Sequence, residues 1–254
     1  MGDGKALQAG TSHHLGQNFT KAFDVKYQDK NNEWQHCWST SWGVSTRLIG
    51  ALVMAHGDDS GLILPPRLAP IQVVIIPIYK KGDEKEAVLA KAAELHGRLI
   101  KAGVRAHLDD REESPGYKYS EWELKGVPLR VELGPRDLAK NSVMAVRRAL
   151  NDDGSRNKQF FAMDGIEATV IAELETIQSA LFERAKKFRE RMTISIDDLA
   201  AFIPRLDSEG GFLMAHWCGS AACETAIKDE TKATIRVIPF DAKDEAGACI
   251  HCAK

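Results

Sequence analysis

The stretch Val73-Val74-Ile75-Ile76-Pro77-Ile78 contains the longest run of β-branched apolar residues of the chain, and it decides the fold of the middle of the protein. A continuous apolar run of this length is typical of a strand that is covered on both faces. The segment 84–102 behind it predicts an amphipathic helix that ends at Gly103, and 104–108 predicts a second strand. The residues on the apolar stripe of that helix are Val88, Ala92, Leu95 and Leu99. A strand–helix–strand unit pairs its strands in parallel through a right-handed crossover, so we predict an α/β domain.

The sequence on both sides of this unit sets its limits. Between residues 129 and 133, leucine or valine alternates with Arg130 and Glu132, which predicts a strand with one buried and one polar face. Residues 142–146 are another predicted strand, and the expected sheet is mixed. Two prolines within 64–67 disfavour helix and predict a linker. We therefore expect three parts, at residues 1–66, 67–165 and 166–254.

The last of these parts is expected to be a small α/β module behind a long helix. An amphipathic helix is predicted over 168–192, and its apolar residues repeat at helical spacing. The residues expected to face inward are Val170, Leu174, Ile177, Leu181 and Phe188. Further helices are predicted at 196–202 and 224–231, and a strand at 235–240.

The first part, residues 1–66, has too few elements for an independent domain. The sequence predicts an extended segment at 22–27, a polar turn at 29–33, a second strand through Trp42 and a helix over 48–56. Two extended segments and one helix cannot enclose a core of their own. We therefore expect these strands to have an unpaired edge and an uncovered apolar face.

Charge and hydropathy exclude some classes of protein. The formal net charge of −2 over 254 residues argues against a protein that coats nucleic acid through a general positive field. It leaves docking through a local patch open, because phosphate attraction is screened beyond about 8–10 Å in physiological salt. No apolar run approaches the roughly 20 residues of a membrane span, and the first residues lack the apolar core of a signal peptide. We expect a cytoplasmic protein with no membrane partner.

Four of the five cysteines form two close pairs near the C-terminus: Cys218, Cys223, Cys249 and Cys252. Tetrahedral zinc favours two such thiolate pairs at about 2.3 Å per sulfur, and four thiolates leave no position for water. We therefore predict a structural zinc site. The other interpretations are four unrelated buried cysteines, a redox-active pair, or the replacement of one ligand by His216 or His251.

Two stretches near the N-terminus suggest a small polar ligand. The stretch 8–19 surrounds His13 with small and hydroxyl residues beside an expected flexible turn. The stretch 41–50 carries a glycine in a strand, which permits a ligand to approach closely, and Arg47 at the opening of a helix. A guanidinium there can stack on a purine or fork a phosphate. On these residues alone, an ordinary loop and an arginine paired with a surface carboxylate remain open interpretations.

Longer motifs resemble those of prolyl-tRNA synthetases. Residues 8–21 resemble their ligand loop, and 42–47, continuing through 57–58 to 64–67, is similar to their motif 3. The segments that resemble their anticodon-binding domain are 109–111, 114–119, 121–130 and 132–137. The cysteine spacing is similar to that of the archaeal/eukaryotic-type enzymes, which carry a C-terminal zinc module. The resemblance covers nearly the whole chain.

The resemblance implies a role for each matching residue and a fold for each part. The residues it assigns to ATP are Gln8, Thr11, Ser45 and Arg47; to proline, His13; and to the anticodon guanines, Glu123, Arg130 and Arg136. The parts would be a remnant of a class II antiparallel catalytic sheet, an α/β anticodon-binding domain and the zinc module. In the reaction of these enzymes, the proline carboxylate attacks the α-phosphate of magnesium-bound ATP in line. Positioning of the reactants and neutralisation of their charge catalyse this step. No protein nucleophile is expected, and no residue is assigned as catalytic.

The expected guanine contacts follow from base-edge chemistry. Arginine forks the O6/N7 edge of guanine, and a carboxylate accepts from its N1–H and N2–H2 groups. Arg130 could instead be a strand-face charge paired with Glu132 or Glu123. Trp122 is expected in the core. The basic residues that could contact phosphates are Lys125, Lys140, Arg147 and Arg148, although the last two could equally form a solvated surface pair.

The chain is thus expected to be the C-terminal portion of a proline–tRNA ligase, which converts proline and ATP to prolyl-adenylate and transfers proline to tRNA(Pro). It contains no class II motif 1 or 2, so we expect it to be inactive alone, with residues 1–66 mobile, swapped or protected in a dimer. The full-length protein is expected to be a homodimer. The alternatives are a stand-alone tRNA-binding or regulatory module without catalysis, and a structural zinc protein unrelated to tRNA. Four residues favour the ligase, because a binding module has no use for an ATP pocket: Gln8, Thr11, His13 and Arg47.

Overall fold

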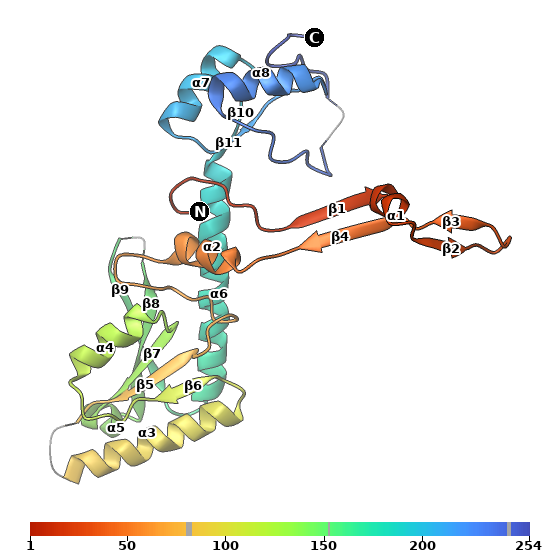
Figure 1. The fold of residues 1–254 in the computed structure, drawn as a ribbon. Coiled ribbons are helices and arrows are strands. Elements are labelled where there is room, and N and C mark those ends of the chain that lie inside the picture. The colour runs from red at the N-terminus through yellow and green to blue at the C-terminus, as the bar shows by residue number, and fades with distance from the viewer. Residues whose placement is uncertain (80–82, 152, 243–244) are drawn as a thin grey trace. The chain divides into compact units, whose positions relative to one another are not determined.

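The computed structural model describes residues 1–79, 83–151, 153–242 and 245–254. The chain divides into two compact units, one made of Met1 and Ala6–Ala55 and the other of Gly2–Lys5 and His56–Lys254. Figure 1 shows the helices and strands of both units. Within the described residues, no helix is both long and apolar enough to cross a membrane.

A five-stranded sheet forms the centre of the larger unit, in the spatial order β6-β5-β7-β8-β9. β5 (Val73–Pro77) lies between β6 (Ala106–Leu108) and β7 (Leu129–Leu133) and runs parallel to both. β8 (Ser142–Leu150) and β9 (Arg156–Ala162) extend the sheet in antiparallel pairs. All residues of β5 are buried, as a strand covered on both faces requires. The prediction of an α/β fold with a mixed sheet is therefore confirmed.

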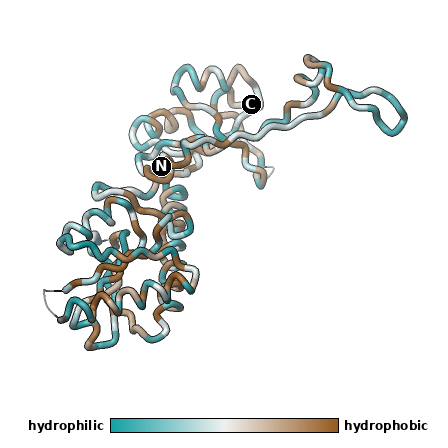
Figure 2. The backbone as a smooth tube through the Cα atoms, turned by 60° about the horizontal axis from the view of Figure 1, so that its bottom comes forward, coloured by the Kyte–Doolittle hydropathy of each residue, from teal (hydrophilic) through white to brown (hydrophobic). Residues whose placement is uncertain are grey.

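Helices cover both faces of this sheet. Helix α3 (Asp83–Lys101) connects β5 to β6, and its predicted apolar stripe is fully buried. Leu95 and Leu99 of α3 share one apolar core with residues of helix α6 (Ile166–Arg191). Helix α4 (Pro115–Leu124) serves the opposite face, where its Trp122 packs against alternate residues of β5. In Figure 2 the hydrophobic stretches of this unit gather in its interior.

Helix α6 begins two residues before the predicted segment 168–192 and ends one residue before its end. Val170, Leu174, Ile177 and Leu181 are at most 5% exposed, which confirms most of the predicted inward stripe. Phe188 is only partly buried. The first part of α6 therefore belongs to the core of the sheet, and its last turns do not.

The C-terminal module is an α/β arrangement, but its strands differ from the expected one. β10 (Thr193–Ser195) pairs in parallel with β11 (Phe212–Met214). Helix α7 (Leu199–Ser208) starts after Asp198, whose side chain accepts a hydrogen bond from the Ala200 backbone, and helix α8 (Ala221–Thr231) follows.

The strand predicted at 235–240 is wrong: these residues, all within the described range 153–242, form neither helix nor strand. Among the described residues no strand pairs with this segment, and Pro239 within it lacks the backbone N–H that a ladder bond needs. Its apolar side chains are exposed instead, namely Ile235, Val237, Ile238 and Phe240.

The smaller unit is built from two antiparallel pairs and two helices. β1 (Thr11–Gly16) pairs with β4 (Ser39–Gly43), and β2 (Lys26–Gln28) pairs with β3 (Trp34–His36). Helix α1 (Asn18–Ala22) follows β1, and helix α2 (Arg47–His56) follows β4. The sequence predicted the polar turn, α2 and a strand that reaches Trp42, which the structure divides into β3 and β4. The extended segment predicted at 22–27 is mostly wrong, because only its last two residues belong to β2 and its first belongs to α1, which was not predicted. The sequence interpretation also missed β1, because Gly-Thr-Ser-His looks like a flexible turn.

Large apolar side chains lie on the surface of the smaller unit. Thr20 is the one buried residue of Ala6–Ala55, all of which the structure describes. The aromatic residues more than half exposed are Phe19, Phe23, Trp34, Trp38 and Trp42. The predicted uncovered apolar face is therefore present in this chain, whereas tips such as 29–33 are hydrophilic (Figure 2).

Candidate functional site

Helix α4 positions the first predicted guanine-binding residue, Glu123. The helix opens with Ser114, whose hydroxyl accepts a hydrogen bond from the Tyr117 backbone at 3.3 Å, and Pro115 stands at its first position. Trp122, 5% exposed, packs into the core beside β5 and holds the last turn of the helix against the sheet. Its expected place in the core is therefore confirmed. Glu123, the next residue, contacts Arg130 of β7.

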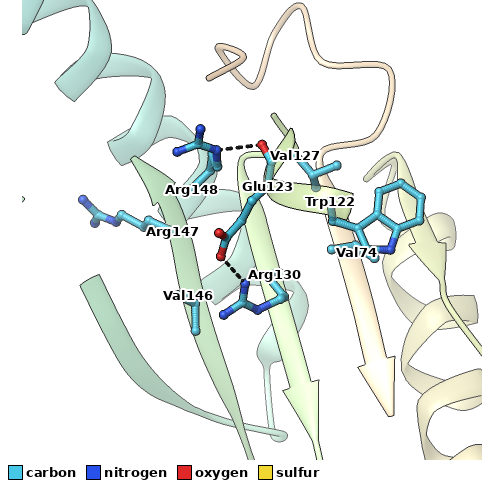
Figure 3. A pocket seen from close by; sticks show the side chains of 8 residues that line it. All are labelled: Val74, Trp122, Glu123, Val127, Arg130, Val146, Arg147 and Arg148. Atoms are coloured by element: carbon cyan, nitrogen blue, oxygen red, sulfur yellow. Dashed lines mark hydrogen bonds and ion pairs between the residues drawn. The ribbon is translucent and has the colours of Figure 1, made fainter. Parts of the chain in front are cut away.

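Glu123 and Arg130 lie in direct contact in a shallow pocket (Figure 3). Arg130 donates from Nη1 to Glu123 Oε1 at 2.8 Å and from Nε to Glu132 Oε1 at 2.9 Å. Its guanidinium carbon lies 3.9 Å from the ring centre of Tyr119, a cation–π distance. Arg130 is only 8% exposed, so the polar face of β7 is covered. Both carboxylate pairings left open by the sequence exist here.

A second guanidinium, Arg156 at the start of β9, also binds Glu123. It donates from Nη2 to Glu123 Oε2 at 2.9 Å and from Nη1 to Oε1. Burial alone would raise the pKa of Glu123, but hydrogen bonds from Arg156 and Arg130 outweigh it, and the pKa lies below its ordinary value. Glu123 is thus an ionised acceptor. The sequence interpretation missed β9 and Arg156, although Asp153-Gly154 is a hairpin signal.

Asp109, directly after β6, is the polar anchor under α4. It accepts hydrogen bonds from Arg111 (2.9 and 2.8 Å) and from Trp122 Nε1 (2.7 Å), and its backbone oxygen accepts one from Lys118 Nζ (2.9 Å). Asp109 and Lys118 are 1% and 2% exposed. Burial would raise the pKa of Asp109, yet the bonds from Arg111 and Trp122 hold it well below its usual range. This buried network fixes α4 on the sheet.

Arg136 lies apart from the Glu123 cluster. It is the second residue of helix α5 (Pro135–Ala139), which begins directly after β7 and Gly134. Its side chain is exposed and makes no hydrogen bond or ion pair with any residue that the structure describes. The structure therefore brings Glu123 and Arg130 together and leaves Arg136 free at the surface.

The two arginines that follow each other on β8 are not a solvated pair. Arg147 forks Glu173 of α6 at 2.5 and 3.0 Å. Arg148 is 5% exposed and binds Asp58 and the backbone oxygen of Glu123. The interpretation as surface charges is wrong, because antiparallel pairing in mid-sheet turns both side chains toward covering segments.

In the smaller unit, three of the four predicted ATP residues meet. Arg47, at the start of α2, donates from Nε to Ser45 Oγ at 3.1 Å and from Nη1 to Gln8 Oε1 at 3.5 Å. Its partners are neutral, so the predicted alternative of a surface ion pair is not what this unit contains. Thr11 and His13 lie on β1, opposite Gly43 and Ser41. All of these side chains face solvent or are partly exposed.

The four C-terminal cysteines form one cluster. Their sulfur atoms all lie within 4.8 Å of one another, with Cys218 Sγ 3.7 Å from Cys223 Sγ and 3.8 Å from Cys252 Sγ. A tetrahedral ion with sulfurs at about 2.3 Å would separate them by about 3.8 Å. All four are free thiols. The cluster could therefore hold a metal ion, and its geometry fits the size of zinc.

The surroundings of the sulfurs shift the pKa values of two of the cysteines in opposite directions. Backbone hydrogen bonds from Cys252 and His251 lower the pKa of Cys249 to about 6, while the hydrogen bond with Cys218 and burial raise the pKa of Cys223 to about 12. His216 hydrogen-bonds Asp197 at 3.0 Å and is not part of the cluster. The four sulfurs alone thus make the ligand set.

Comparisons with known proteins show which families the chain resembles. Residues 72–172 match the family described as "Anticodon binding domain", and residues 199–254 match "Prolyl-tRNA synthetase, C-terminal". Similar curated proteins include the proline–tRNA ligases of Chloroflexus aurantiacus (51% identical, 99% of this chain) and Roseiflexus sp. (50%, 100%), and proline–tRNA ligase 2 of Bacillus cereus (46%, 100%). The chain spans about half the length of these relatives, 52% of each.

Proposed function

The chain belongs to the prolyl-tRNA synthetase family, and from this premise we propose that it supplies anticodon recognition and part of the ATP and proline pocket of a proline–tRNA ligase. That enzyme would activate proline with ATP to prolyl-adenylate and transfer it to tRNA(Pro). The observation that carries the proposal is the ionised Glu123 beside Arg130, in a segment that matches an anticodon-binding family. Relatives named as ligases match the whole chain, which favours this function over a stand-alone binding or regulatory module.

Three parts divide this work, with the boundaries predicted from the sequence: 1–66, 67–165 and 166–254. The first would carry the nucleotide and proline residues, the second the anticodon site and the third the metal site. We include a cytoplasmic location and a homodimeric full-length enzyme in the proposal. The chain alone is expected not to aminoacylate tRNA.

The anticodon site would read guanines through complementary charges. Glu123 would accept from the N1–H and N2–H2 groups of one guanine, and Arg130 and Arg136 would fork the O6/N7 edge. The exposed Arg136 is ready for such a contact, whereas Arg130 is already bound to two carboxylates. A base that engages Glu123 must therefore share or displace a guanidinium. Arg156, 42% exposed at its side chain, is the more accessible of the two.

The nucleotide site would act by positioning. Gln8, Thr11, Ser45 and Arg47 would hold ATP with its magnesium, and His13 would line the proline pocket. Arg47 carries a full positive charge with only neutral hydrogen-bond partners, so it can neutralise a phosphate without first breaking an ion pair. No residue of the chain is proposed as a nucleophile or general base.

The cysteine cluster would hold structural zinc. Four thiolates at these separations fit a tetrahedral zinc ion and leave no position for water. The ion would connect the loop before α8 to the last residues of the chain. Its role is then in folding and not in the reaction.

The anticodon proposal is tested with the purified chain and the anticodon stem-loop of tRNA(Pro). Arg136→Ala should weaken binding by about 1–3 kcal/mol, because a bidentate base contact is lost and no protein partner is left unpaired. Replacing the guanines with adenine should remove most of this difference. Fluorescence anisotropy at fixed salt measures each affinity.

Lys140→Ala is the matched control, since Lys140 is an exposed cation at the end of α5. It should weaken guanine and adenine stem-loops equally or not at all. A chain that binds both stem-loops with the same affinity would contradict the proposed function.

A further inference from the structure

We propose that Arg148 and Asp58 are positioning residues for Glu123: together they fasten the end of α4 so that its carboxylate can read a guanine. The inference rests on the proposed function, because Glu123 is taken as the base-reading group. Neither residue is placed at the RNA. Their effect would pass through the backbone of Glu123.

Arg148 uses its whole guanidinium at this joint. Nη1 and Nη2 fork the Asp58 carboxylate at 2.9 and 2.5 Å. Nε donates to the backbone oxygen of Glu123 at 2.8 Å, the dashed line between these two residues in Figure 3. The side chain of Arg148 is 3% exposed, and that of Asp58 is 32% exposed. The hydrogen bond from Arg148 is the main reason that the pKa of Asp58 lies below its ordinary value. A planar fork fixes direction as well as distance.

The bond from Arg148 adds to a backbone hydrogen bond that already closes the end of the helix. Glu123 is the next-to-last residue of α4, and its backbone oxygen accepts from Gly126 N at 3.0 Å as well as from Arg148 Nε at 2.8 Å. A carbonyl oxygen has two lone pairs and can accept both bonds, so the guanidinium ties this oxygen to Asp58 in addition to the turn. The Glu123 carboxylate stands on the same residue as this oxygen. Fixing the oxygen therefore fixes the origin of the side chain that contacts Arg130.

The segment that follows Asp58 is also bound to the end of α4. Leu62 N donates to Leu124 O at 3.1 Å and Leu64 N donates to Gly126 O at 3.2 Å, so the segment after Asp58 lies along the end of α4. A Cβ at Gly126, which has φ +74°, would come within 2.6 Å of the Leu62 side chain. The contact is made main chain to main chain.

The joint also lies on the covalent path between the two proposed sites. Helix α2, which starts with Arg47, ends at His56, two residues before Asp58. The stretch from Asp58 to Leu64 then reaches α4 directly. Arg148 thus ties α4, which carries Glu123, to the segment 58–64, which follows helix α2 and its Arg47.

The test measures guanine preference in the metal-loaded chain. The ligands are the proline anticodon stem-loop and the same RNA with each guanine in turn replaced by inosine, which lacks only the 2-amino group. Loss of this donor should weaken binding to the parent chain about tenfold at the guanine that Glu123 reads. Glu123→Gln should reduce the preference to nearly one.

Asp58→Asn is the decisive variant. It should cut the guanine-over-inosine ratio by about threefold or more while inosine RNA binds as it does to the parent. Arg148→Lys, which keeps the charge but loses the fork, should do the same. Glu167→Gln is the matched control. Glu167 also binds both nitrogens of an arginine fork, that of Arg98, but neither residue belongs to α4. This variant should leave the ratio unchanged.

The outcomes separate the two proposals. If Glu123→Gln lowers the ratio and Asp58→Asn does not, the positioning role is wrong and the anticodon role stands. If Asp58→Asn weakens both RNAs equally, its role is general stability and the positioning role is again wrong. If Glu123→Gln leaves the ratio unchanged, the proposed reading of guanine by Glu123 fails, and the inference fails with it. Thermal unfolding of each variant confirms that binding is measured on folded protein.

Discussion

The two units of the chain hold their residues in opposite ways. In the larger unit, β5 is fully buried, and two arginines of β8 in the same sheet are tied into the pairs Arg147–Glu173 and Arg148–Asp58. In the smaller unit, Thr20 is the one buried residue, and Trp34 and Trp42 are about two-thirds or more exposed. The comparison teaches that antiparallel pairing alone can define strands without enclosing a core. Only the larger unit has the buried apolar area to be stable by itself.

The largest expected effect concerns the C-terminal module, which fits neither side of this comparison, because its folded structure would depend on a bound metal ion. Chelation of bound metal at neutral pH should remove structure from α8 onward, as structural zinc sites contribute about 10–16 kcal/mol of binding free energy. Circular dichroism and the methyl NMR signals of the sheet measure the two regions separately. The sheet should persist.

Cys249→Ser should reproduce the effect of the chelator, since Cys249 is one of the four clustered sulfurs. Cys37→Ser is the matched control, because Cys37 lies outside that cluster. Unchanged helicity after complete metal removal would exclude a folding role for the ion.

Hydrogen exchange should sharpen the comparison between the two units. The amides of β5 and β7 should exchange about 10³-fold or more slowly than those of β1 and β4, because core strands open only with a large part of the global unfolding free energy. Exchange followed by mass spectrometry resolves these peptides. Comparable protection in both units would show that the exposed apolar face of the smaller unit is covered in solution.

Matched truncations should give the next largest difference. Leu99→Ala in α3 removes a side chain that is 0% exposed and should cost about 2–5 kcal/mol of unfolding free energy. Ile49→Ala in α2 removes one that is 67% exposed and should change it by less than about 0.5 kcal/mol. Urea titrations with equal slopes provide the measurement. Equal costs would contradict the burial difference.

The smallest effect concerns acid stability. Arg98 forks Glu167 at 2.7 and 2.9 Å, and this hydrogen bonding lowers the pKa of Glu167 from 4.5 to about 2. A depressed pKa stabilises the fold above about pH 4.5, and that stabilisation disappears as the pH falls to about 2. Parent and Glu167→Gln should therefore differ in Tm at pH 6 and converge at pH 2.

The exposed pair Asp24–Lys26 of the smaller unit is the counterpart of this test. Its hydrogen bond lowers the pKa of Asp24, but the Asp24 side chain is 72% exposed. Solvent screening should make Asp24→Asn neutral at every pH. If the difference in Tm between Glu167→Gln and its parent widens toward pH 2, the assigned direction of the Glu167 pKa shift is wrong.

The sequence predicts the buried elements of the larger unit better than it predicts contacts between distant residues. Val73–Pro77 was predictable because a strand buried on both faces is apolar throughout, and the stripe of α3 because burial of one helix face gives a helical period. The cysteine cluster followed from spacing, because two close pairs can meet at one ion. The pairing of Arg130 was only one of several possibilities, since partners on α4 and β9 are distant in sequence.

The errors have physical causes of the same kind. Residues 235–240 are rich in apolar residues like a strand, but Pro239 lacks a backbone N–H and no strand pairs with them in the part of the chain that is described. β1 was hidden because its small polar residues carry no apolar period. Arg148 was misjudged because its partner Asp58 lies 90 residues away, and no local pattern announces such a contact.

The glycines at 61 and 126 have a further consequence for how the protein tolerates change. A Cβ at either position would come within 2.6 Å of atoms in the opposing segment, of Leu124 in one case and Leu62 in the other. The neighbouring leucines can be exchanged for other apolar residues, but the glycines cannot. Random mutagenesis should therefore find that Gly61 and Gly126, which contact no ligand, tolerate substitution as poorly as ligand-contacting residues do. A survey that ranks residues by distance from the RNA or the nucleotide would pass over both.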